Sequence, residues 1–199
     1  DDFEPDETSY SMISVGDNLY AVESNHGALD KATQSGTMSR IVDISASQGH
    51  IVPTAVVYKN GDFYVGNLNT FPIVEGSSKI LKITPGGDIS VAYTGFTTIL
   101  VITLDKKGRI YVLENTTGNA SPTPGTGRVI RINNDGSRKV IATGLSLPTG
   151  ITYGPDGNLY VSANGFGPNA FGGGQVLKVT LKHCDCDEND NVNGKTVNN

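Results

Sequence analysis

Short apolar segments alternate along the chain with tight polar turns, and no amphipathic run has the length of an ordinary helix. In "SKILKI" and "GRVIRI" apolar and polar residues alternate with a period close to two, as in a half-buried strand. Turns such as "KNGD" and "GPDGN" are rich in Gly, Asp and Asn, which tight hairpins favour. The pattern therefore predicts an all-β fold of short antiparallel strands.

The same arrangement of strand, turn and strand occurs four times. Its copies are "MISVGDNLYAVESN", "AVVYKNGDFYVGNLN", "VITLDKKGRIYVLENT" and "ITYGPDGNLYVSANG". Each holds a tyrosine in its second strand, and these four tyrosines are spaced 44, 47 and 49 residues apart: Tyr20, Tyr64, Tyr111 and Tyr160. A third strand is predicted after each copy, at "SRIVDI" from Ser39, "SKILKI" from Ser78, "GRVIRI" from Gly127 and "GQVLKV" from Gly174. The second and third copies add a fourth strand, "ISVAYTGF" and "KVIATGL".

Four antiparallel strands recurring at this period indicate the blades of a β-propeller. We expect blades at about 8–50, 51–96, 97–145 and 146–181, preceded at 1–7 by the end of an outer strand and followed at 182–199 by an acidic polar tail. The last copy stops after three strands, so the four blades are expected to form part of a six-bladed ring. The alternative is a four-bladed ring completed by its own N-terminal strand.

Composition narrows the function classes. The net charge is −5, and nine of the 20 acidic residues lie in the two terminal segments, which leaves a nearly neutral body. No basic stripe interleaved with aromatic residues is present, and no apolar run approaches the roughly 20 residues that a membrane span needs, so neither nucleic acid nor a membrane is an expected partner. Cys184 and Cys186 are separated by one residue, which supports neither a disulfide framework nor a four-ligand zinc site.

Three longer stretches resemble a known family. They are "HIVPTAVVYKNGDFYVGNLNTFP", "ILKITPGGDISVAYTGFTTILVITLDKKGRIYVLE" and "GRVIRINNDGSRKVIATGLSLPTGITYGPDGNLYVSANGFGPNAFGGGQVLKV". Over about residues 8–180 the sequence is similar to the ScyD/ScyE family of secreted bacterial six-bladed propellers, which are related to NHL-repeat and gluconolactonase-like propellers. The resemblance implies a secreted, periplasmic or cell-surface protein, although no signal peptide is visible, and it implies no established activity.

The connections between the second and third strands are expected to carry function. They span 23–39, 67–78, 114–127 and 163–174 and are long, polar and rich in Gly and Pro, whereas the turns between first and second strands are short. Long loops gathered on one face of a rigid scaffold are where binding usually resides. We therefore expect a protein, glycan or small-molecule partner on that face.

Polar residues where the strands meet this face are the candidate site. At the ends of the second strands these are Glu23, Asn67, Glu114 and Asn164, and at the starts of the first strands they are Thr54, Thr98 and Thr149, with His50 nearby. Oxygen ligands of this kind suit Ca²⁺ or another hard divalent ion, with Glu23 and Glu114 as the carboxylates. In gluconolactonase-like propellers the catalytic metal is held at an equivalent central place. The alternative is that these side chains cap strand ends and bind loop backbones.

Three functions stay open on the sequence. The preferred hypothesis is a binding or scaffold module that uses its long loops. The second is a metal-dependent enzyme of the lactonase or lyase kind, with the metal at the channel mouth. The third is a structural subunit of a larger extracellular assembly, joined through acidic termini and open blade edges.

Overall fold

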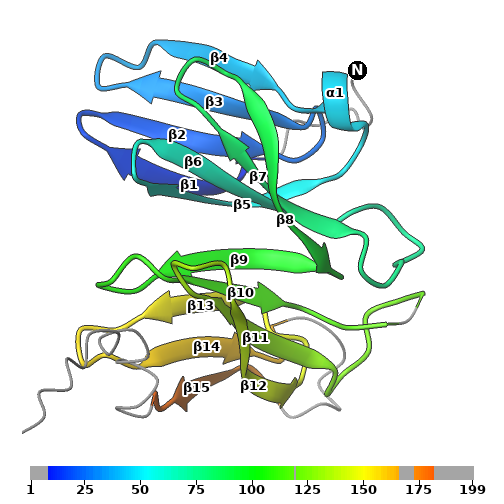
Figure 1. Ribbon diagram of the computed structural model, residues 1–199. Coiled ribbons are helices and arrows are strands. Elements are labelled where there is room, and N and C mark those ends of the chain that lie inside the picture. Colours follow the sequence, from blue (N-terminus) through cyan, green and yellow to red (C-terminus); the bar gives the residue numbers. More distant parts are fainter. Residues whose placement is uncertain (1–8, 119, 166–172, 182–199) are drawn as a thin grey trace, which may run out of the picture.

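The computed structural model describes residues 9–118, 120–165 and 173–181, and in these residues the chain forms fifteen strands and one short helix (Figure 1). The strands make four separate antiparallel sheets in chain order. The first sheet contains β1 (Ser9–Val15), β2 (Asn18–Glu23), β3 (Ala28–Thr33) and β4 (Met38–Asp43). After helix α1 (Ser45–Gln48), the second contains β5 (Pro53–Lys59), β6 (Asp62–Asn67), β7 (Ser78–Ile83) and β8 (Ile89–Phe96).

The other two sheets repeat the plan. The third contains β9 (Ile99–Leu104), β10 (Ile110–Glu114), β11 (Gly127–Ile132) and β12 (Arg138–Leu145). The fourth contains β13 (Gly150–Tyr153), β14 (Leu159–Ala163) and β15 (Gln175–Val179). Each sheet is a simple meander in which consecutive strands pair, so the predicted β-propeller blades, with three strands described in the last, are confirmed.

The hydrophobic cores lie between successive blades and not within one of them. Blades 1 and 2 bury Val22, Leu29, Phe63 and Val65 together, and the repeat tyrosine Tyr20 contacts Phe63 at 4.7 Å between ring centroids. Equivalent cores join blade 2 to blade 3 and blade 3 to blade 4. The first strands contact one another in order, β1 with β5, β5 with β9, and β9 with β13, which makes them the innermost strands. Figure 1 shows the four sheets stacked in this sequence.

One predicted element of blade 1 is wrong. The segment "SRIVDI" was expected as the third strand, but it lies mostly in β4, the outermost strand, and the third strand is β3 within the predicted loop 23–39. The sequence of β3, "ALDKAT", has little intrinsic β-propensity, and it pairs with β2 along its whole length because Ala28 and Leu29 are fully buried there. The expected long loop of this blade is therefore only the connection 24–27.

In blades 2 and 3 the two faces differ as the sequence predicts. First and second strands join through tight turns on one face, whereas residues 68–77 and 115–126 form the long connections between second and third strands on the other (Figure 1). We call this second side the loop face. The loop expected at 163–174 is described only in part, and the segments 1–7 and 182–199, with both cysteines, lie outside the described residues.

Candidate functional site

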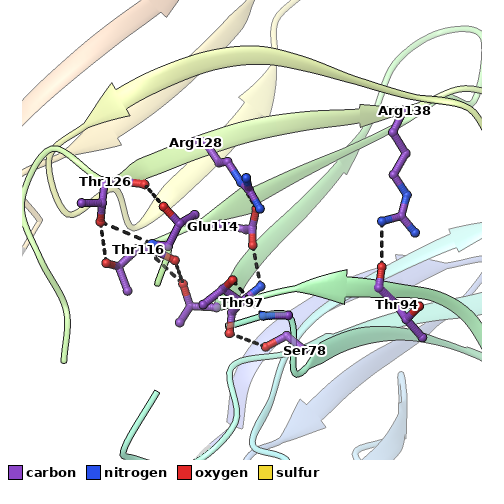
Figure 2. A network of polar contacts seen from close by, with 11 residues as sticks. Ser78, Thr94, Thr97, Glu114, Thr116, Thr126, Arg128 and Arg138 are labelled. Atoms are coloured by element: carbon purple, nitrogen blue, oxygen red, sulfur yellow. Dashed lines mark hydrogen bonds and ion pairs between the residues drawn. The ribbon is translucent and has the colours of Figure 1, made fainter. Parts of the chain in front are cut away.

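Glu114, at the end of β10, is a buried carboxylate that joins two blades. Its side chain is fully buried, Oε1 accepts a hydrogen bond from the Thr97 backbone N–H, and Oε2 pairs with Arg128 Nε, both at 2.5 Å. Thr97 lies on the connection between β8 and β9, so Glu114 ties blade 3 to the segment that enters it (Figure 2). Both carboxylate oxygens therefore have structural partners.

Glu23 occupies the equivalent position in blade 1 and binds its own loop. It is 4% exposed, and its oxygens accept hydrogen bonds from the backbone N–H groups of Asn25 at 2.8 Å and His26 at 2.6 Å. The His26 ring nitrogen Nδ1 lies 3.2 Å from Glu23 Oε2. A carboxylate that accepts such bonds fixes the turn that follows its strand.

Asn67 and Asn164 also meet backbone groups. Asn67 Nδ2 donates to the Ile51 carbonyl at 3.0 Å, and Asn67 Oδ1 accepts from the Lys79 N–H at 2.8 Å. Asn164 follows β14 with φ of 53°, in the left-handed region that asparagine tolerates, and its Nδ2 donates to the Gly173 carbonyl at 3.3 Å. Its Oδ1 is buried and has no hydrogen-bond partner among the described residues.

The rim threonines lie where the sequence predicts, at the starts of the first strands. Thr54 Oγ1 donates to the Ile99 carbonyl of the next blade at 2.6 Å, and Thr98 Oγ1 donates to the Thr116 carbonyl at 2.7 Å. Thr149 Oγ1 lies 3.2 Å from Ser162 Oγ. The expected supporting residue His50 is half-buried before β5.

A second set of contacts at the rim was not predicted from the sequence. The carbonyls directly before the three rim threonines each accept a hydrogen bond from a side chain of the preceding blade. The donors and distances are Ser24 Oγ to Pro53 at 2.7 Å, Ser78 Oγ to Thr97 at 2.6 Å, and Asn115 Nδ2 to Pro148 at 2.9 Å. These contacts fix where each new blade starts, and we call them the entry bonds. Figure 2 shows the one made by Ser78.

The metal-ligand role of this ring stays a prediction. Among the described residues, no three His, Cys, Asp or Glu side chains converge as metal ligands would. The observed bonds of Glu23, Asn67 and Glu114 are those of strand-end caps. In the same described part of the chain, no helix is long and apolar enough to cross a membrane.

A cavity of about 210 Å³ opens beside the rim on the loop face. Its lining includes the buried residues Thr98, Leu100 and Asn115 and the half-buried Thr149, and Thr98 and Thr149 are two of the predicted rim residues. The long connections supply Leu68, Phe71, Ile73 and Pro122, and Tyr10 comes from the first strand of blade 1. Tyr10 is 45% exposed, and its partial burial raises the pKa of its phenol above the usual value. The cavity thus combines residues from all four blades.

The comparisons with known proteins point to the fold. No family model matches the sequence, and no curated protein matches it. Among solved structures, a catalytically inactive virginiamycin B lyase from Staphylococcus aureus with quinupristin has a TM-score of 0.61 at 16% identity, covering 92% of this chain and 58% of that chain. A gluconolactonase from Xanthomonas campestris has a TM-score of 0.61 at 16% identity, covering 81% and 53%.

A nidogen/laminin complex is similar at a TM-score of 0.56 and 19% identity, covering 74% of this chain and 52% of that one. The chain therefore spans a little over half the length of these structures. They include two enzymes and one complex between proteins, so at such identities the likeness extends to architecture and not to activity. On strand order and on these comparisons, the chain has a β-propeller fold with four consecutive blades.

Proposed function

We propose that the chain is a binding module that holds its partner on the loop face. The observation that carries this proposal is the pairing of the two long connections. The Ile73 N–H donates to the Ala120 carbonyl at 3.1 Å, which joins the two connections. The Gly76 N–H of the first connection also donates to Thr97 Oγ1, on the segment between β8 and β9, at 3.3 Å. The connections 68–77 and 115–126 thus form one structured surface beside the cavity.

Exposed apolar side chains mark the same surface. Phe71 is 60% exposed and Val74 is 59% exposed, and both lie on the connection between β6 and β7. Large apolar groups held in water by an ordered loop favour contact with a partner. The turns on the opposite face are short and present Gly, Asp and Lys. The loop face therefore presents exposed apolar side chains, whereas the opposite face presents short polar turns.

The proposal is tested by mapping small probes on the ¹⁵N-labelled chain by NMR. Indole represents uncharged aromatic molecules, benzoate charged aromatic molecules, and glucose sugars. We expect at least one probe to give saturable amide shifts within 68–77, 98–100 and 115–126. If none of them perturbs these residues, or if the shifts gather on the turns at 60–61 and 154–158, the proposal fails.

The metal-dependent lactonase or lyase is the rival proposal, and the enzymes among the similar folds support it only by architecture. It would use Glu23, Asn67, Glu114 and Asn164 around a divalent ion such as Ca²⁺. Native mass spectrometry with added Ca²⁺ tests it, because a ligand role predicts a stoichiometric ion that Glu23→Gln removes. An unchanged mass of the unaltered chain would reject this role.

Membership of the ScyD/ScyE family, secretion and a six-bladed ring are proposed on the sequence phrases given above. One surface of blade 1 supports further blades, because Met12 and Leu19 are 61% and 42% exposed. By strand register their counterparts in blade 2 are Val56 and Phe63, which the first blade covers. The mass of the natural protein tests this proposal, which requires a value well above the 20.9 kDa of this chain.

A further inference from the structure

The cavity on the loop face has walls that the fold holds in place. Leu100 and Thr98, from the start of β9, are buried at 5% and 0% exposure. The connection that carries Phe71 and Ile73 is bonded to the neighbouring connection through the Ala120 carbonyl. The space is therefore enclosed by strand residues on one side and by two joined loops on the other.

Three of the four polar side chains that line the cavity, those of Thr98, Asn115 and Thr149, already make hydrogen bonds within the protein, and the fourth is the Tyr10 phenol. Thr98 Oγ1 donates to the Thr116 carbonyl and accepts from the Thr116 N–H at 2.9 Å. Asn115 Nδ2 is engaged by the Pro148 carbonyl, and the Thr149 hydroxyl lies against that of Ser162. No charged side chain is among the lining residues of the described chain. A charged or polyhydroxylated ligand would lose its hydration without finding replacement partners.

The remaining lining is apolar and aromatic. Leu68, Ile73 and Leu100 present aliphatic groups, and Phe71 and Tyr10 place two partly exposed rings at the cavity, from different blades. Aromatic rings contribute large contact areas and favour stacked or edge-on contacts with other rings. The volume of about 210 Å³ suits one ring or two fused rings, and it is small for a peptide segment.

From this combination we infer that the cavity binds a small, uncharged aromatic molecule. The inference rests on the proposed function, because it places the ligand on the same loop face. Phe71 and Tyr10 contact the ring, Leu100 and Ile73 pack against its edge, and Asn115 and Thr98 serve the fold and not the ligand. Phe71 therefore sets affinity for aromatic ligands.

The test compares variants of the whole chain in the NMR titration with indole, benzoate and glucose. We expect saturable indole shifts at residues 68–73 and 98–100, and at least fivefold weaker binding of benzoate and glucose. Phe71→Ala should weaken indole binding at least fivefold, whereas Phe71→Leu retains part of it. Glu75→Ala is the matched control, because Glu75 is exposed on the same loop and does not line the cavity.

A second variant fills the space from inside. Leu68→Trp places a larger side chain at a half-buried lining position and should abolish indole shifts while the amide spectrum stays dispersed. If indole leaves the cavity residues unshifted, or if Phe71→Ala and Leu68→Trp bind indole like the unaltered chain, the inference is wrong. If glucose or benzoate shifts the loop face and indole does not, the inference fails and the proposed function stands. Failure of all three probes overturns both.

Discussion

Glu114 and Asn115 are adjacent in sequence but belong to two different regions of the loop face. Glu114 lies in the ring of strand-end caps, where its oxygens are bound to Thr97 and Arg128. Asn115 borders the cavity, whose other walls are mostly apolar. The ring of strand-end caps contains carboxylate and amide groups, but these are already hydrogen-bonded within the fold. The cavity has few such groups, but it is accessible. Polar residue types alone therefore do not lead to the cavity that we propose as the binding region.

The largest expected effect is the loss of stability in Glu114→Ala. The substitution leaves the Thr97 N–H and the Arg128 guanidinium without their buried acceptor, and we expect about 2–3 kcal/mol lower free energy of unfolding. Urea denaturation measures it, and Glu75→Ala, an exposed carboxylate on the neighbouring loop, is the control expected within about 0.5 kcal/mol. Equal small losses in both variants would show that the ring is not a structural element.

The entry bonds should give an intermediate effect. Ser78→Ala removes the donor to the Thr97 carbonyl at a site 1% exposed, and we expect a loss of about 1–2 kcal/mol in the same urea experiment. Ser77→Ala changes the adjacent, exposed serine, whose hydroxyl bonds within its own connection, where it donates to the Val74 carbonyl and accepts from Asn69 Nδ2. A loss in Ser77→Ala as large as in Ser78→Ala would refute the distinction between blade-joining and local contacts.

The exposed carboxylate of Asp156, on the side opposite the loop face, should contribute less to stability than that of Glu114. Lys178, followed by Asn158 and Tyr160, holds the pKa of Asp156 well below its usual range. Because the folded pKa is below the unfolded value, this stabilisation is present above about pH 4 and is lost as the pH falls further. Asp156→Asn should therefore show a slightly shallower loss of stability between about pH 4 and pH 2. An acid profile identical to that of the unaltered chain would contradict this.

Phe71, in the lining of the cavity, should be nearly dispensable for folding. Phe71 is 60% exposed, so Phe71→Ala is expected to change the free energy of unfolding by no more than about 0.5 kcal/mol. A thermal or urea unfolding curve measures it next to Glu114→Ala. A loss above about 2 kcal/mol would mean that Phe71 serves the fold, and the contrast between the two regions would disappear.

The fold was predictable because the repeat supplies the same evidence several times. The strands β7 and β8 begin and end where the sequence pattern places them, since their turns carry the Gly and Asp that hairpins need. β3 was missed because "ALDKAT" has no strand signal of its own, and only pairing with β2 makes it a strand. The local sequence pattern did not predict this strand, because tertiary contacts determine its conformation.

The sequence did not predict the cavity, although two of the predicted rim residues lie in its lining. Thr98 and Thr149 do line the cavity, because strand order alone places them at the loop face. Tyr10 and Phe71 were not identified, since they are far apart in sequence and neither follows a motif. Their common position at the cavity depends on how the blades pack. No local spacing in the sequence indicates this packing.

The entry bonds have the same orientation at all three joints between blades. Blades 1 to 3 each carry a side-chain donor at the loop face, on or next to the second or third strand, and the next blade presents a backbone carbonyl as the acceptor at its entrance. Because the acceptor is a backbone carbonyl at each of these joints, it does not depend on the residue type there, and both hydroxyl and amide donors serve it. A repeat joined in this way places few sequence requirements on its neighbour, which favours a change of blade number by duplication of whole repeats.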